Sequence, residues 1–159
     1  MALSRLLEPD RRFMRSALQQ AEQAKEKGEV PVGAVVVHGK QIVGRGHNLV
    51  ESLEDPTAHA EMIAITAACE TLQSKVLKGC TLYVTLEPCP MCAGAIVLAR
   101  LDRLCFGAMD VKAGSASTLY NIPQDERLNH QVDVISGIEA DQAEDLLRDF
   151  FQQLRHSPS

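Results

Sequence analysis

Two short motifs, His59-Ala60-Glu61 and Pro88-Cys89-Pro90-Met91-Cys92, carry the residue types of a catalytic metal site. Their imidazole and two thiols supply three metal ligands, and the carboxylate of Glu61 is left over. Catalytic zinc sites typically use three protein ligands and keep a fourth position for water, whereas structural sites close with four. Zinc lowers the pKa of that water to about 7, and a neighbouring carboxylate can accept its proton. The spacing therefore predicts that His59, Cys89 and Cys92 hold Zn²⁺ and that Glu61 is the catalytic proton carrier.

Both motifs are predicted to lie at the starts of helices. Asp55-Pro56 places a capping carboxylate before a proline, which is typical of a helix start, and Pro88 opens the second helix. Cys89 and Cys92 are three residues apart, so both thiols are expected on one face of its first turn. A helix N-terminus carries positive partial charge, which favours the thiolate form that binds metals. Two helix N-termini are therefore expected to meet at the metal.

The rest of the chain is expected to alternate strands and helices. Apolar spacing and β-branched runs set the boundaries. The expected helices are 13–27, 55–72, 88–100 and 143–154, and the expected strands are 32–38, 41–46, 81–86, 104–106 and 132–135. Such alternation implies an α/β fold with a mixed sheet and helices on both faces. The length suits a single domain, residues 1–159.

Composition excludes several classes of protein. Hydrophobic residues make up 45% of the chain and charged residues 23%, which is ordinary for a globular protein. No apolar run approaches the roughly 20 residues that span a bilayer, and Met1 to Asp10 does not resemble a signal peptide, so we expect a cytoplasmic protein without membrane contact. With a net charge of −5, any nucleic-acid contact needs a local basic patch. The candidates are Arg11, Arg12, Arg15, Lys112 and Arg155.

Two other interpretations of the cysteine motif stay open. Cys-x-x-Cys after a strand is also the arrangement of thioredoxin-like redox proteins. A structural zinc site could recruit Cys80 or Cys105 as its fourth ligand. The redox interpretation does not explain the His-x-Glu motif, and the structural-zinc interpretation gives Glu61 no role. We therefore favour a catalytic zinc site.

The order His-x-Glu, then Pro-Cys-x-x-Cys, is the signature of zinc-dependent nucleobase deaminases. Further segments resemble the bacterial tRNA-specific adenosine deaminases over about Phe13 to Arg155. They are Glu29 to Val35, Asn48, Asp55 to Glu61, Leu82 to Cys89, Met91 to Ala95, Phe106 to Ala108, Asp110, Lys112, Gly114, Asn129-His130 and Asp149 to Phe151. One departure is Ala113 to Thr118, which differs from the pattern common in the family.

The resemblance implies a cytidine deaminase-like, three-layer α/β/α sandwich around a five-stranded mixed sheet, assembled as a homodimer. It implies hydrolytic deamination of the wobble adenosine in a tRNA anticodon, in bacteria an arginine tRNA, to inosine. His59, Cys89 and Cys92 would hold the zinc, and Glu61 would shuttle protons. The alternative is a deaminase of a free nucleobase or nucleoside of the guanine or cytosine type, which an acidic surface also suits.

The resemblance further implies four substrate-binding residues, Asn48, Asp110, Lys112 and Phe151. Each has a simpler interpretation from the sequence alone. Asn48 is also typical of a turn that ends a strand, and Asp110 and Lys112 are also typical of a solvated loop. Helical spacing predicts that Phe150 and Phe151 are mostly core.

Overall fold

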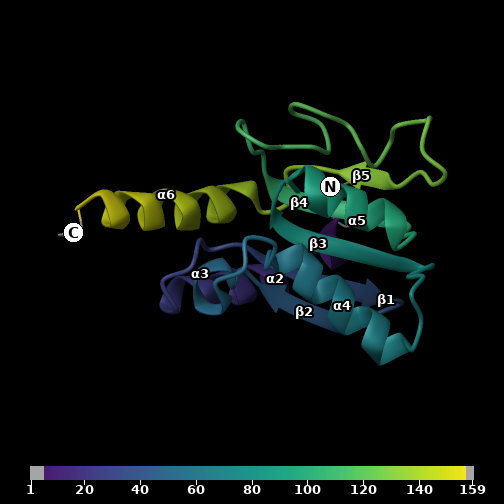
Figure 1. Cartoon of the computed structure of the whole chain (residues 1–159), viewed down its shortest axis with the longest axis horizontal. Helices are drawn as coiled ribbons and strands as arrows, with labels where there is room; N and C mark the ends of the chain where they lie inside the picture. Colours follow the sequence, from purple (N-terminus) through teal and green to yellow (C-terminus); the bar gives the residue numbers. More distant parts are fainter. Residues whose placement is uncertain (1–5, 157–159) are drawn as a thin grey trace.

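The computed structural model describes residues 6–156 and builds them around one five-stranded sheet (Figure 1). The strands run in the order β2 (Gln41–His47), β1 (Gly33–His38), β3 (Cys80–Leu86), β4 (Arg103–Ala108) and β5 (Asp133–Ile135). β1 is antiparallel to both β2 and β3, while β3, β4 and β5 are parallel. The predicted five-stranded mixed sheet is confirmed.

Strand register separates the core into two layers. It aligns one row of residues across three strands, Val36, Leu82 and Leu104, and a neighbouring row, Val35, Tyr83 and Cys105. Because successive strand residues point to opposite faces, the first row packs with α4 (Ala60–Leu72) and α5 (Pro90–Leu98) and the second with α2 (Glu8–Glu26). Figure 1 shows α4 and α5 in front of the sheet. The three-layer arrangement is therefore the predicted one.

Helix α4 packs closely on β2, and glycines make this approach possible. A Cβ added to Gly46 would lie 2.5 Å from the carbonyl oxygen of Ala60, and one added to Gly44 would lie 2.4 Å from that of Ala64. Side chains at these two positions would push the helix off the sheet. The position of the α4 N-terminus is thus set by direct contact of backbone with backbone.

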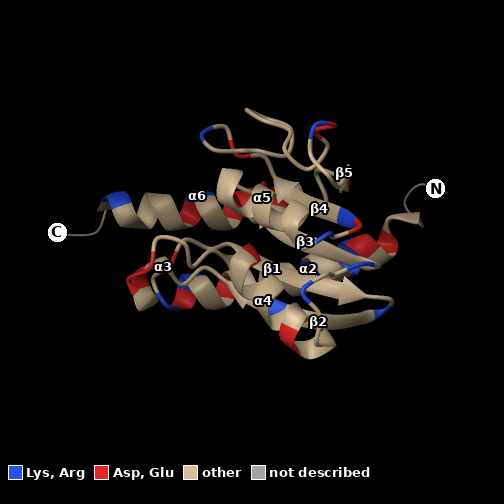
Figure 2. Cartoon of the chain, turned by 45° about the vertical axis from the view of Figure 1, so that its right-hand side comes forward, with Lys and Arg blue, Asp and Glu red and all other residues tan. Residues whose placement is uncertain are grey.

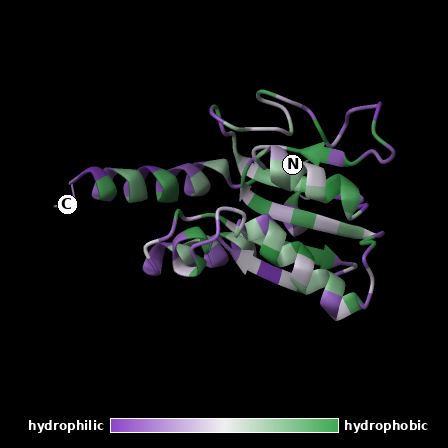
Figure 3. Ribbon diagram, viewed as in Figure 1, coloured by the Kyte–Doolittle hydropathy of each residue, from purple (hydrophilic) through white to green (hydrophobic). Residues whose placement is uncertain are grey.

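The last helix, α6 (Ala140–His156), does not pack as predicted. Its first turns pack beside α2 and the ends of β3 and β4 through Ala143, Leu146 and Leu147. Farther along, Phe151 and Leu154 are 43% and 59% exposed. Figure 1 shows α6 running past the body, and Figure 3 shows hydrophobic residues recurring along it. The prediction that Phe150 and Phe151 are mostly core is wrong for Phe151, because the helix outruns the sheet that it starts on.

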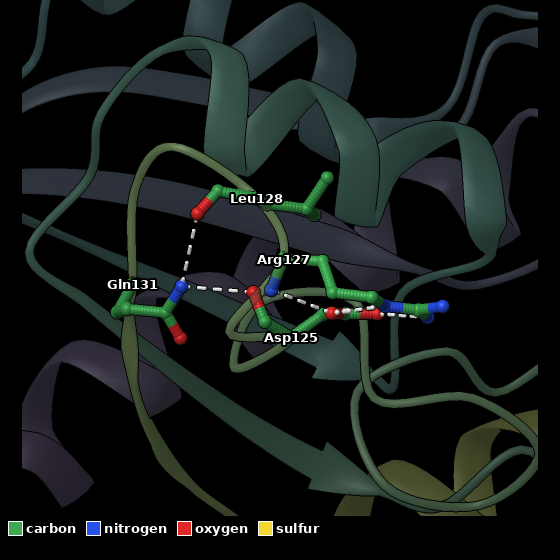
Figure 4. A network of polar contacts seen from close by, with 4 residues as sticks. All are labelled: Asp125, Arg127, Leu128 and Gln131. Atoms are coloured by element: carbon green, nitrogen blue, oxygen red, sulfur yellow. Dashed lines mark hydrogen bonds and ion pairs between the residues drawn. The ribbon is translucent and has the colours of Figure 1, made fainter.

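A long irregular connection joins β4 to β5 and is held by local polar contacts (Figure 4). The Asp125 carboxylate accepts hydrogen bonds from the main-chain and guanidinium N–H groups of Arg127. The Gln131 amide donates to the carbonyl oxygens of Asp125 and Leu128.

Within residues 6–156, no helix is both long and apolar enough to cross a membrane.

Candidate active site

The metal-binding motifs cap their helices, and this corrects the predicted helix starts. α4 begins at Ala60 and not at Asp55-Pro56, because the Asp55 carboxylate instead closes a turn by accepting hydrogen bonds from the Thr57 amide and hydroxyl, 2.8 and 2.7 Å away. Likewise α5 begins at Pro90, not at Pro88, and Cys89 is its cap. His59 and Cys89 are therefore extended residues immediately before the two helix ends, and neither side chain caps its own helix.

The three predicted ligands meet in space. His59 Nδ1 lies 3.5 Å from Cys89 Sγ and 3.5 Å from Cys92 Sγ, and the three ligand atoms all lie within 4.8 Å of one another. A tetrahedral zinc with Zn–S bonds near 2.3 Å and Zn–N bonds near 2.1 Å separates nitrogen and sulfur ligands by about 3.6 Å. The donor set and its spacing fit zinc. Cys80 and Cys105 are buried in β3 and β4 and do not belong to this group.

The pKa values of the thiols of Cys89 and Cys92 are shifted in opposite directions. A hydrogen bond from Cys92, helped by the imidazole of His59, lowers the pKa of Cys89 to about 4 against the opposing effect of burial. The hydrogen bond with Cys89, together with burial, raises the pKa of Cys92. The lowered pKa favours the thiolate form of Cys89, which lies at the positive end of α5.

Glu61 is the buried carboxylate of the site. It is the second residue of α4 and only 4% exposed. Burial raises its pKa to about 7, although the charge of His59 acts in the opposite direction. A carboxyl group that titrates near neutral pH can both accept and return a proton, as a general acid–base requires.

A cavity of about 310 Å³ opens beside this cluster. This volume lies within the range of small-molecule sites, ~300–1,000 Å³. His59, Glu61 and Cys89 line the cavity together with two of the predicted substrate-binding residues, Asn48 and Asp110. The structure thus brings a metal site, a titratable carboxylate and polar walls into one pocket.

The other two predicted substrate-binding residues are not among those that line this pocket. Lys112 is exposed on the loop that also bears Asp110. Phe151 lies on the projecting part of α6, where its ring meets that of Phe150 edge-on at a centroid distance of 5.3 Å. Of these four residues, Asn48 and Asp110 line the pocket that opens beside the metal cluster, and Lys112 and Phe151 do not.

Two further pocket residues, Glu29 and Glu87, were not singled out from the sequence. Glu29 accepts hydrogen bonds from the amides of Glu51 and Ser52, 3.0 and 2.6 Å away, next to the short helix α3 (Val50–Leu53). Burial acts to raise the pKa of each carboxyl group, but hydrogen bonds, chiefly from Ser52 to Glu29 and from Thr118 to Glu87, bring it below its usual value. The available signal was a glutamate flanked by uncharged residues close to a proline: Glu29 lies two residues before Pro31, and Glu87 lies directly before Pro88.

The candidate basic residues do not form a patch at this pocket. None of the lining residues is Lys or Arg. Arg12 lies over the Phe13 ring at 5.0 Å from its centroid, and Arg15 pairs with Glu8 and Glu139. In Figure 2, basic and acidic residues are interspersed over the molecule. The pocket lining itself therefore offers no Lys or Arg side chain to a polyanion.

Comparison with known proteins places this site in a family. The profile of the MafB19-like deaminases matches residues 8–155. The tRNA-specific adenosine deaminase of Bacillus subtilis strain 168 is 50% identical over 146 residues, which is 92% of this chain and 91% of that protein. The tRNA-specific adenosine deaminase of Aquifex aeolicus strain VF5 is 48% identical over 145 residues, 91% of this chain and 95% of the relative.

The chain belongs to the tRNA-specific adenosine deaminase family. A solved structure from work on A-to-I editing by tRNA:A34 deaminases shares 43% identity and a TM-score of 0.82, covering 86% of this chain and 99% of that one. A guanine deaminase from Nitrosomonas europaea, 23% identical with a TM-score of 0.75, shares the fold over 88% of this chain and 83% of its own. The cytidine deaminase-like fold predicted for a tRNA-specific adenosine deaminase is confirmed.

Proposed function

We propose that this protein hydrolyses the wobble adenosine of a tRNA anticodon to inosine and releases ammonia. The observation that carries the proposal is the convergence of His59, Cys89 and Cys92 beside the buried carboxylate of Glu61. Identity of 50% with a tRNA-specific adenosine deaminase over nearly the whole chain supports adenosine in tRNA as the substrate.

Each group in the pocket has a separate part in this reaction. His59, Cys89 and Cys92 would hold a zinc ion, which would supply the Lewis acidity that makes water nucleophilic near neutral pH. Glu61 would take one proton from the attacking water and deliver it to the purine ring nitrogen. It would then take the proton left on the newly added hydroxyl group and pass it to the departing amine, so that the C6 carbonyl forms as the C–N bond breaks. Water and adenosine are thereby converted into inosine and ammonia. Because the anticodon loop is single-stranded, its adenine can enter the pocket without breaking a base pair.

Substrate recognition is divided between the pocket and its surroundings. Asn48 and Asp110 line the pocket, and we assign to them contacts with the nucleotide that enters it. Lys112 and Phe151 lie outside the pocket, where they can meet the loop of the anticodon stem-loop beyond the reacting nucleotide. An exposed aromatic ring is a stacking platform for an unpaired base.

The proposal also covers the tRNA substrate, the domain organisation, the oligomeric state and the cellular location. We assign an arginine tRNA as the substrate, one deaminase domain over residues 1–159, a homodimer, and a cytoplasmic place of action where tRNA is used. The homodimer is assigned on the resemblance to the bacterial tRNA-specific adenosine deaminases. A second chain would also extend the surface that meets the RNA.

Deamination of a free base is the second candidate. It is favoured by a pocket without basic side chains and by the fold shared with a guanine deaminase. Assays of five substrates separate the two candidates. They are an RNA stem-loop with adenosine at the wobble position, the same stem-loop with guanosine there, and free adenosine, cytidine and guanine. Ammonia and inosine from the adenosine stem-loop alone support the proposal, and ammonia from a free base alone overturns it. Activity on RNA should fall steeply with added salt, whereas activity on a free base should not.

A further inference from the structure

Glu87 is a carboxylate enclosed by the chain's own main-chain donors. It follows β3, two residues before Cys89, and is only 2% exposed. Its Oε2 accepts three amide hydrogen bonds, from Ala116, Ser117 and Thr118, at 3.1, 2.9 and 2.9 Å. Its Oε1 accepts the Asp110 amide at 3.1 Å and the Thr118 hydroxyl at 2.5 Å. Five donors from both ends of segment 110–118 thus meet at one side chain.

The segment closes on Glu87 only because residue 114 has no side chain. A Cβ added to Gly114 would lie 2.4 Å from the Asp110 carbonyl oxygen and 2.5 Å from the Glu87 carboxyl carbon. The next residue donates its amide to the Pro88 carbonyl oxygen at 2.9 Å. Segment 110–118 therefore wraps around residues 87 and 88, immediately before the cysteine motif.

What the segment carries is one wall of the pocket. Asp110 and Ala113 line the cavity. The Asp110 Oδ1 accepts the amides of Lys112 and Ala113 at 3.0 and 3.3 Å, so its side-chain direction depends on the path of this segment. If Glu87 were lost, the donors turned toward it would lack their acceptor, and buried donors without partners are costly. The segment would then take another path.

We propose that Glu87 is a positioning residue for RNA binding: it fixes segment 110–118 and, through that segment, the place of Asp110 in the pocket wall. The proposal rests on the tRNA deaminase function above. It assigns Glu87 no contact with the substrate and no part in the proton transfers. This role also explains why a carboxylate can lie at an RNA-binding pocket. The charge of Glu87 faces main-chain N–H groups and not the phosphates of the RNA.

Two variants disturb this arrangement in different ways. In Glu87→Gln, the amide oxygen can keep the three N–H groups of residues 116–118, while the NH₂ group can donate to the Thr118 hydroxyl. The Asp110 amide then faces a donor and loses its acceptor. Gly114→Ala keeps the carboxylate and instead forces the segment outward. Glu70→Gln removes the same charge from an exposed position on α4 and is the matched control.

Steady-state kinetics on the wobble-adenosine stem-loop, zinc content and amide exchange test the proposal together. We expect both variants to retain zinc and to raise KM about 10- to 100-fold with a smaller change in kcat. Amide exchange should accelerate at Asp110 in Glu87→Gln, while Glu70→Gln behaves as wild type. A purely structural role would lower thermal stability without this selective rise in KM.

Three results would overturn it. Unchanged KM in folded Glu87→Gln and Gly114→Ala removes the positioning role. Loss of zinc together with kcat assigns Glu87 to the support of the metal motif instead. If the wild-type protein deaminates no RNA, the proposed function is refuted and this inference with it. If the wild-type protein is active and the variants have the same KM, only this inference is refuted.

Discussion

The close contact between β2 and α4 predicts a specific defect in Gly46→Ala. The added methyl group would lie 2.5 Å from the Ala60 carbonyl oxygen and 2.7 Å from the Ala64 amide nitrogen. Restoring an ordinary contact of 3.4 Å requires the start of α4 to move by about 0.9 Å. His59 and Glu61 flank Ala60, so both would move relative to the cysteines on α5.

The size of the defect follows from the tolerance of metal sites. Ligand distances in such sites hold to about ±0.2 Å, so a shift of about 0.9 Å exceeds what the site accepts. We expect zinc affinity to fall about 10- to 100-fold, as it does when groups supporting a metal site are disturbed. Overpacking should also lower the free energy of unfolding by about 1–3 kcal/mol.

Two matched glycine substitutions serve as controls. Gly44→Ala produces a similar clash one helical turn farther along α4, at Ala64 and Ala68, and should destabilise the fold with less effect on zinc. Gly94→Ala adds the same methyl group to α5, where nothing lies within 4 Å, and should leave zinc affinity unchanged. Zinc affinity is measured by competition with a chromogenic chelator, and stability by thermal unfolding. If Gly46→Ala binds zinc like Gly94→Ala, the reasoning is refuted.

Further substitutions test other parts of the structure. Glu61→Gln should keep its zinc but lose about 10²- to 10⁴-fold in kcat, measured by ammonia release, and zinc loss with unfolding would contradict the proton-carrier role. Tyr83→Phe removes the buried hydroxyl that donates to Asp10 at 2.6 Å, so the free energy of unfolding should fall by about 1.5–3 kcal/mol, and an unchanged Tm would refute this. Glu29 has a lowered pKa in the folded state, so it contributes stability above its unfolded pKa of about 4.3 that is lost as pH falls through the folded value. Glu29→Gln should therefore be less stable than wild type near neutral pH but lose less stability as the pH falls below about 4.3 in acid-unfolding titrations, and an equal loss would count against this reasoning.

Sequence patterns predicted the elements of the fold well, because each strand or helix has a periodicity of its own. The boundaries at Asp55-Pro56 and Pro88 were wrong for a shared reason. Each helix starts later than predicted, at Ala60 and at Pro90, because the extended residues His59 and Cys89 are the actual N-caps. A capping signature describes local preference, whereas here the chain uses the extra residues to bring the metal ligands to the helix ends.

Long-range packing could not be predicted from local patterns. The apolar spacing of α6 is real, but nothing in the pattern says that the helix runs beyond the body and leaves Phe151 exposed. In the same way, Glu87 meets its partners only after segment 110–118 folds back over it, some 30 residues along the chain. The convergence of His59, Cys89 and Cys92 could be predicted because their residue types and spacing are typical of zinc ligands.

Sequencing a whole tRNA pool for inosine tests the central claim most directly. Purified protein is incubated with unmodified tRNAs, beside a Glu61→Gln control, and every adenosine-to-inosine change is mapped. We expect inosine only at the wobble position of tRNAs that carry adenosine there, and only with the wild-type protein. Inosine at scattered adenosines, or none while a free base releases ammonia, would contradict it.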